Sequence, residues 1–392
     1  MKLASEILVP RGFEFSSATA GIKVSGAPDL ALAFAPHGAK AAAMFTTNRV
    51  VAVPLQCGRE HLRRTGGRVR AVVVNSGNAN CATGEKGRRA CDQVCRSVAK
   101  AMDCREDEVF PASTGIIGVP LPAGKLIQAI PQLLAARAAD ADAAQRFARA
   151  IMTTDTRMKT ASARFGRATL FGACKGAGMI HPRLATLLVY LFTDAEAKPR
   201  ELRELLHRAV HVTFNRMNVD TDTSTNDTVL LLASGEAGVA KRKDFAAALT
   251  AVCESLARQI VADGEGVQHV VNLRIEGARS DGEASQVAKA IANSMLVKTA
   301  WAGADPNWGR VLAAVGYSGV PIDPNKVDIS FGKFQVCRKG VAAAFDEEKV
   351  HTYLSQPVLD VRVRLGRGKV GATFWTCDLT SEYVHINADY HT

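Results

Sequence analysis

The stretch Lys175-Gly176-Ala177-Gly178-Met179-Ile180-His181-Pro182-Arg183-Leu184-Ala185-Thr186-Leu187-Leu188 lies near the middle of the chain. Two glycines free its backbone and a proline then restricts it, before a threonine that opens an apolar run. If the bond between Ala185 and Thr186 breaks, Thr186 gains a free α-amine that can act as the base for its own hydroxyl. The stretch therefore predicts a self-generated threonine nucleophile, and a turn followed by an ordinary strand is the alternative.

The composition of the 392 residues is that of an ordinary globular protein, with 47% hydrophobic and 22% charged residues. The first residues lack the basic-then-apolar pattern of a signal peptide, and no apolar run approaches the roughly 20 residues that a membrane span needs. Nine cysteines are scattered without a CxxC pair, which favours reduced thiols over a disulfide framework. We therefore expect a cytoplasmic protein of two or three domains without membrane contact.

The net charge of +11 raises nucleic-acid binding as a possible function. However, the basic residues are spread over the chain, and aromatic residues make up only 6% of it, too few for base-stacking platforms. We expect no nucleic-acid partner and interpret the charge as a basic surface that attracts anionic metabolites.

Two further segments combine small polar residues with glycine. The β-branched run at 70–74 leads directly into Asn75-Ser76-Gly77-Asn78-Ala79-Asn80, and Ser113-Thr114-Gly115-Ile116-Ile117-Gly118 lies between a predicted helix and an apolar segment. Glycine lets backbone N–H groups approach a ligand closely, which an oxyanion hole requires. From the sequence alone, plain tight turns are the favoured explanation of both segments.

Three motifs resemble known sites but lack an essential residue. In His207-Arg208-Ala209-Val210-His211, Arg208 replaces the glutamate of a zinc HExxH helix. The acidic run 220–227 begins like a calcium loop, but it lacks the glycine and the final glutamate. The stretch 176–181 begins like a dinucleotide-binding GxGxxG motif and has histidine in place of the third glycine. We therefore expect no metal and no cofactor, and we interpret 220–227 as a hydrogen-bonded wall of a site.

The central stretch resembles the signature of the ornithine acetyltransferase (ArgJ, glutamate N-acetyltransferase) family. Further segments resemble that family in the same order along the chain: Asn75–Asn80, Ser113–Gly118, Asp222–Asp227, Asp305-Pro306-Asn307-Trp308-Gly309-Arg310 and Ile386-Asn387-Ala388-Asp389-Tyr390. Together they span nearly the whole chain, and several spaced segments are far more specific than one. Thr221 is a departure, because the family has glycine at that position.

The resemblance implies the residues of an active site. By resemblance the precursor cleaves itself between Ala185 and Thr186, Thr186 becomes the nucleophile, and the pair Thr114 and Gly115 stabilises the oxyanion. The implied substrate contacts are Thr154, Lys175, Thr186, Glu265, Asn387 and Thr392. Thr153 competes with Thr154, because the loop that follows is shorter than in many relatives.

The resemblance also implies a reaction. The acetyl group would pass from N2-acetyl-L-ornithine to L-glutamate in arginine biosynthesis, by a ping-pong mechanism through an acetylated threonine. Acetyl-CoA as a second donor stays open. Two other interpretations also stay open: an N-terminal-nucleophile amidase or aminopeptidase that passes the acyl group to water, and a binding protein without catalysis.

The expected fold is α+β, an N-terminal-nucleophile-like αββα sandwich with a smaller C-terminal α+β domain. The self-cleaved fragments would be residues 1–185 and 186–392, assembling as an α2β2 heterotetramer by resemblance. Within the second fragment we expect residues 186–280 to complete the sandwich and 281–392 to form the smaller domain. Apolar and polar residues alternate over 383–387, which predicts a docked strand at the chain end.

Overall fold

The structure is a computed structural model that describes residues 1–181 and 187–389. Its first sheet has the strand order β4-β3-β2-β8-β7-β6-β5, with β1 paired to β2. The strands are β1 (Glu14–Ala18), β2 (Leu30–Phe45), β3 (Arg68–Asn78), β4 (Val109–Ile116), β5 (Lys159–Phe165), β6 (Ala168–Lys175), β7 (Leu188–Glu196) and β8 (Thr228–Val239). Ala185 and Thr186, the predicted cleavage site, lie outside the described residues, as does Thr392.

Strand β2 joins the two halves of this sheet. Its first part pairs with β1 and β3, and its last six residues, Lys40–Phe45, pair with β8. The pairing with β3 shifts register between Phe34 and Ala39, where Gly38 adopts a left-handed φ of 78°. The strand therefore bends there and passes from one half of the sheet to the other.

The two halves pack face to face around one apolar cluster. Phe15 of β1 contacts Phe171 and Phe192 of the other half, with ring centroids 5.7 and 4.9 Å apart. The same buried cluster includes residues of β3, β4, β7 and β8 and the inner face of α4 (Ala141–Ala150). This cluster lies between the two halves of the first domain and takes up one face of β6 to β8. The other face of these strands packs in a second cluster with α5 (Pro199–Val212) and α6 (Arg242–Ala262), so the strands are apolar on both faces.

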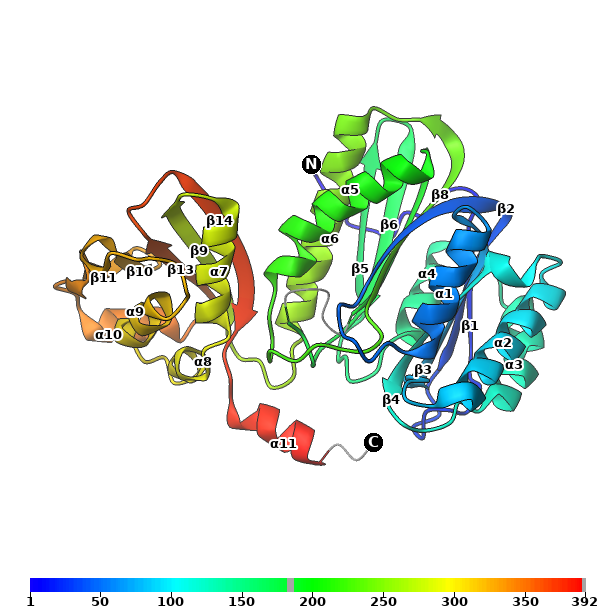
Figure 1. The fold of residues 1–392 in the computed structure, drawn as a ribbon, viewed down its shortest axis with the longest axis horizontal. Coiled ribbons are helices and arrows are strands. Elements are labelled where there is room, and N and C mark those ends of the chain that lie inside the picture. The colour runs from blue at the N-terminus through cyan, green and yellow to red at the C-terminus, as the bar shows by residue number, and fades with distance from the viewer. Residues whose placement is uncertain (182–186, 390–392) are drawn as a thin grey trace.

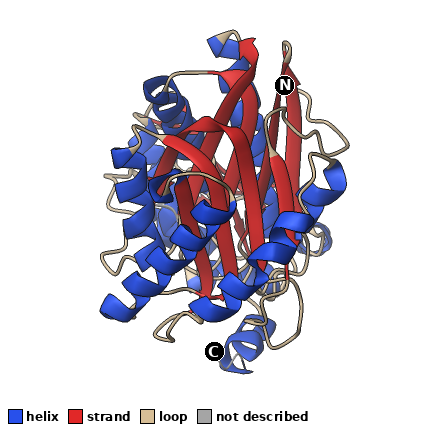
Figure 2. Cartoon of the chain, turned by 90° about the vertical axis from the view of Figure 1, so that its right-hand side faces the viewer, coloured by secondary structure: helices blue, strands red, loops and turns tan. Residues whose placement is uncertain are grey.

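Helices cover the two outer faces. On the β1–β4 side lie α1 (Val53–Arg64), α2 (Gly84–Ala101) and α3 (Ala123–Ala135), and on the β5–β8 side lie α5 (Pro199–Val212) and α6 (Arg242–Ala262). Figure 2 shows the strands between these helical layers. The αββα layering predicted from the sequence is thus confirmed. Helix α6 has the length and hydropathy of a membrane span, but its apolar side chains fill the core against β5 and β6.

The second domain is built on a six-stranded sheet of order β12-β11-β10-β13-β9-β14 (Figure 1). Its strands are β9 (Val270–Ala278), β10 (Asp328–Phe331), β11 (Phe334–Arg338), β12 (Val341–Ala342), β13 (Val358–Arg364) and β14 (Val370–Cys377). Its helices are α7 (Asp281–Ala292), α8 (Met295–Ala302), α9 (Trp308–Gly316) and α10 (Glu347–Leu354). The remaining short helices are η1 (Glu106–Glu108), η2 (Phe214–Arg216) and η3 (Pro324–Lys326).

The boundary expected at residue 281 needs correction. Strand β9 ends at residue 278 and pairs with β13 along its length, so it belongs to the second sheet. The second domain therefore begins between α6 and β9. The alternating pattern of β9 alone could not distinguish membership of one sheet from membership of the other.

The strand predicted at the chain end is also wrong. Residues Ser381–Asp389 form helix α11, which leaves β14 and lies beneath the first domain (Figure 1). Tyr383 and Ile386, three residues apart, are its half-buried side chains, whereas Val384 is 60% exposed. The helical spacing of these two contacts overrides the short alternation on which the prediction rested.

Candidate active site

A cavity of about 300 Å³ lies where loops of the first sheet meet the 263–266 loop and α11. Its lining residues are Ala79, Thr114, Gly115, Ile116, Ile117, Thr153, Thr154, Lys175, Gly178, Met179, Ser224, Thr225, Asn226, Glu265 and Asn387. Among these are all the described residues that the sequence predicts as site residues. The competitors Thr153 and Thr154 both line the cavity, so their geometry does not separate them.

Thr114 and Gly115 lie at the carboxyl end of β4, which runs parallel to β3. Gly115 pairs with Gly77 of β3 and has a left-handed φ of 130°. A Cβ atom on Gly115 would lie 2.3 Å from the carbonyl carbon of Gly77, so no other residue fits without moving both strands. Glycine is therefore needed there for the close approach of the two strand ends that border the cavity.

Asn226 holds this end of the sheet together, and the sequence analysis did not single it out. Its side-chain amide donates to the backbone carbonyls of Ala79 and Ser113, at 2.7 and 2.8 Å. Its oxygen accepts from the Thr225 hydroxyl at 2.6 Å. The available signal was the density of hydrogen-bonding residues in 220–227, which predicts a wall of a site but not which side chain joins the loops.

Lys175 ends β6 and is 3% exposed. Burial lowers the pKa of its ammonium below the ordinary value, while nearby carboxylates, Asp155 first among them, oppose that shift. Burial alone would raise the pKa of Asp155, but Lys175 and Lys159 outweigh it and hold this pKa below its usual value. The floor of the site thus contains opposite charges that stabilise each other in a dry environment.

Glu265 enters the cavity from the loop after α6. Its backbone N–H donates to the carbonyl of Ala177 at 3.0 Å, and its Oε2 accepts from the Asn387 side chain at 2.9 Å. A Cβ atom on Gly178 would lie 2.3 Å from the same Oε2. Because Gly178 has no side chain, the Glu265 carboxylate can lie directly against its backbone. Asn387 of α11 also contacts this carboxylate.

The 220–227 loop binds the central stretch at two points. The Asp220 carboxylate accepts from the N–H groups of Met179 and Ile180, at 2.5 and 2.7 Å, and Met179 has a left-handed φ of 56°. The Asp227 carboxylate accepts from the N–H of Leu187 at 3.0 Å. Burial raises the pKa of Asp227. The 220–227 loop therefore holds the backbone on both sides of the predicted cleavage site, at Ile180 and at Leu187.

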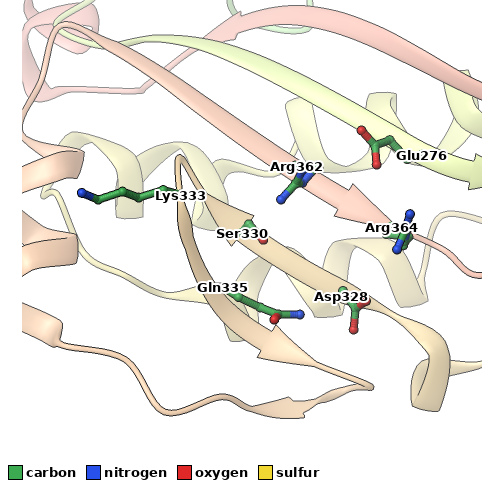
Figure 3. Close-up of a pocket in the computed structure, with 7 residues that line it drawn as sticks. All are labelled: Glu276, Asp328, Ser330, Lys333, Gln335, Arg362 and Arg364. Atoms are coloured by element: carbon green, nitrogen blue, oxygen red, sulfur yellow. The ribbon is translucent and has the colours of Figure 1, made fainter.

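A second charged hollow, of about 350 Å³, lies on the open face of the second sheet (Figure 3). Its lining residues are Glu276, Asp328, Ser330, Lys333, Gln335, Arg362 and Arg364. No predicted site residue is among them. Within residues 1–181 and 187–389, no group of three or more His, Cys, Asp or Glu side chains could hold a metal ion.

An αββα sandwich with a polar cavity among its loops defines a protein of the N-terminal-nucleophile-like fold class. The profile of the ArgJ family matches residues 14–392, so the chain belongs to the ArgJ family. This membership confirms the resemblance stated above and the assignment of the chain as an enzyme of that family.

Individual relatives match almost the full length. The arginine biosynthesis bifunctional protein ArgJ of Brucella suis is 43% identical over 400 residues, covering 98% of this chain and 96% of that protein. The protein of the same name from Geobacter sulfurreducens is 44% identical over 395 residues, covering 97% and 99%. The crystal structure of the Bacillus halodurans protein is similar over 50% of this chain and 96% of its own, at 40% identity and a TM-score of 0.49.

Proposed function

We propose that the chain is a self-processing acetyltransferase that moves the acetyl group from N2-acetyl-L-ornithine to L-glutamate in arginine biosynthesis. The proposal rests on one observation: in this member of the ArgJ family, a single cavity is lined by Thr114, Gly115, Lys175 and Glu265. The relatives named above carry arginine biosynthesis in their names. We place the enzyme in the cytoplasm, with no metal or cofactor in the reaction.

Self-cleavage would precede catalysis. The bond between Ala185 and Thr186 breaks, and residues 1–185 and 186–392 stay associated, as an α2β2 heterotetramer in the full assembly. Support comes from the 220–227 loop, whose Asp220 and Asp227 carboxylates hold backbone N–H groups before and after the cleavage site. A segment held at both ends loses less conformational freedom when its bond reaches the attacking geometry.

The chemistry that we propose is ping-pong acyl transfer. The Thr186 hydroxyl attacks the acetyl carbonyl carbon and gives its proton to its own α-amine, and Thr114 and Gly115 stabilise the oxyanion. The carbon–nitrogen bond then breaks, and ornithine leaves with the proton on its amine. The amine of glutamate attacks the threonine ester, which restores the hydroxyl and releases N-acetylglutamate.

Charge would orient the amino-acid substrates. Glu265 pairs with the side-chain ammonium of ornithine, and Lys175 balances a substrate carboxylate or the developing charge. Asn387 and Thr392 contact substrate from the chain end, and Thr154 contacts it from the loop after α4. The half-exposed position of Glu265 at the cavity wall agrees with a role in binding a soluble ammonium group.

The test is incubation of the purified protein with N-acetylornithine, with and without glutamate, while N-acetylglutamate and free acetate are measured. Formation of N-acetylglutamate only when glutamate is present supports transfer. Acetate release at the same rate in both samples would indicate the amidase alternative. A third sample with acetyl-CoA and glutamate decides the second donor.

Cleavage is read separately by denaturing electrophoresis and N-terminal sequencing. The wild-type chain should give a fragment beginning Thr186-Leu187-Leu188, and Thr186→Ala should stay whole and inactive. Cleavage of the same bond in Thr186→Ala would contradict the nucleophile assignment.

A further inference from the structure

Three buried charged side chains lie behind the cavity without lining it. The Lys159 ammonium is 2.6 Å from Oδ1 of Asp155 and 2.5 Å from Oδ2 of Asp263. The three side chains are 1%, 0% and 4% exposed, respectively. Lys159 begins β5, Asp155 lies in the loop after α4, and Asp263 follows the last residue of α6. The ammonium therefore joins segments that are far apart in the sequence.

Each carboxylate in turn holds the backbone of a segment that borders the cavity. Asp155 accepts from the N–H of Thr153 at 2.9 Å and from the N–H of Gly176 at 2.7 Å. Asp263 accepts from the N–H and the hydroxyl of Thr156. Through these bonds the loop at 153–157, the start of the central stretch and the loop at 263–266 share one buried anchor.

The segments that share this anchor carry residues of the cavity wall. Thr153 and Thr154 lie on the first, Gly178 on the second and Glu265 on the third. Glu265 follows Asp263 by two residues, and its carboxylate occupies the space over Gly178. The place of Glu265 relative to Lys175 therefore depends on how firmly the 263–266 loop is tied to the other two.

We propose that Lys159 is a positioning residue for the acetyl-transfer site, which ties the three loops so that Glu265 is held where the substrate ammonium binds. This inference rests on the proposed function and deepens it, because it assigns a role in amino-acid recognition to a side chain that does not touch the cavity. A buried ammonium between two carboxylates is a rigid tether, since its release would leave uncompensated charge in a dry environment.

The tether also belongs to the charge environment of Lys175. The titratable groups that act on or respond to the Lys175 ammonium are Lys23, Asp155, Lys159, Cys174, Asp227 and Glu265. Burial lowers the pKa of Lys175 most, and Lys159 adds to that lowering, whereas Asp155 opposes it. Removal of Lys159 should therefore raise the pKa of Lys175 and extend its protonated form to higher pH.

The deciding variant is Lys159→Met, and Lys298→Met is its matched control. Lys298 is 2% exposed and bonds to Thr376 and to the carbonyl of Cys377, and none of the three lines the cavity. We expect Lys159→Met to raise KM for N-acetylornithine and weaken L-ornithine binding by about tenfold or more, with a smaller change in kcat. The basic limb of kcat/KM against pH should move to higher pH. Lys298→Met should change neither.

A second variant protects the test against misfolding. Lys159→Met/Asp263→Asn removes the uncompensated charge, while the asparagine oxygen can still accept from the Thr156 N–H. It should fold and still show the raised KM, because the link to Asp155 is lost. Normal KM in folded Lys159→Met, or equal changes in Lys159→Met and Lys298→Met, would overturn the role of Lys159.

Failure of the proposed function would be seen in the wild-type protein and not in the variants. A wild-type protein without acetyl transfer would overturn that function, and calorimetric binding of L-ornithine would then decide the Lys159 question by itself. A wild-type protein that neither transfers acetyl nor binds L-ornithine would overturn both proposals.

Discussion

The cavity of the first domain and the charged hollow on the second sheet differ in the surroundings of their charged side chains. On the second sheet, Arg362 and Arg364 stand on the open face of β13, and neither forms an ion pair with another described residue (Figure 3). Behind the first cavity, Lys159 and Asp155 are buried and bonded at 2.6 Å. Water screens the exposed charges of Arg362 and Arg364, whereas the buried charges of Lys159 and Asp155 act on each other at short range in a low dielectric.

This difference indicates where function is to be sought. The two cavities are similar in volume, and the second has more charged lining residues than the first, so neither volume nor the number of charges points to the first cavity. What separates them is burial: Lys175 is 3% exposed and lies near the buried carboxylate of Asp155, whereas the arginines of the second hollow are exposed. Fixed charges can recognise a substrate, and mobile surface charges mainly keep a protein soluble.

The largest expected effect comes from Thr114→Ala in the first cavity. Loss of one oxyanion donor should lower kcat by about 10²–10³-fold, or about 3–4 kcal/mol, per cleaved molecule. Ser113→Ala is the control, because the Ser113 hydroxyl donates to Asn75 at 2.6 Å and should affect melting more than turnover. A sharp fall in Tm with normal kcat in Thr114→Ala would show a structural role instead.

The next largest effect should follow from Asp155→Asn. Because the pKa of Asp155 is lowered in the fold, its carboxylate contributes stability above its ordinary pKa of 3.8, and this is lost as pH falls through the folded value. The variant should lose about 3 kcal/mol at pH 7, near the lower end for breaking a buried ion pair. Denaturant unfolding of both proteins from pH 7 to pH 2 should show two curves that converge in acid.

Convergence is the decisive feature of that experiment. Parallel curves at all pH values would mean that Asp155 acts through packing and not through its charge. Asp346→Asn, in an exposed ion pair with Lys349, gives the comparison and should lie close to wild type throughout.

A smaller effect is expected from Gly178→Ala. The new methyl group would displace the Glu265 carboxylate, which is the end of a flexible side chain, so the fold should be little changed. KM for N-acetylornithine should rise about tenfold, or about 1.4 kcal/mol. Gly124→Ala, where no atom lies within 4 Å, should keep the wild-type KM. An unchanged KM in Gly178→Ala would separate Glu265 from substrate binding.

The smallest effect should come from the second hollow. Arg362→Gln removes an exposed charge that has no partner among the described residues, and it should change stability by less than about 0.5 kcal/mol. Its kcat and KM should equal those of wild type. A tenfold loss of activity would contradict the contrast between the two hollows, since it would make a screened surface charge essential.

Local patterns in the sequence indicate some of the residues that line the candidate site. Thr114 and Gly115 follow a recognisable small-residue pattern, and Glu265 lies between two glycines. For Thr114 and Gly115 a tight turn is the alternative explanation of the pattern, and Glu265 is implied as a site residue by the family resemblance. The cavity then brings them together with Lys175 and Asn387, which no local pattern could do.

The parts that the sequence did not predict depend on distant partners. Lys159 is an ordinary residue at a strand start until Asp263, 104 positions away, is placed beside it. The role of Asn226 likewise depends on Ala79 and Ser113, which lie far from it in the sequence and accept hydrogen bonds from its side-chain amide in the fold. The chain end also lies against a segment distant in the sequence, since Asn387 of α11 donates to Glu265 at 2.9 Å, and the alternation within the segment gave no sign of this partner.

The strand order of the first sheet has a consequence for the proposed cleavage product. Strands β7 and β8 come from residues after 186 and lie between β6 and β2, which come from residues before it. Lys175 of β6 also pairs directly with Leu188 of β7. After cleavage, β7 and β8 of the second fragment would therefore lie between strands of the first fragment within one sheet. Either one made alone would expose unpaired strand edges, so separate expression should give aggregates and not two soluble halves.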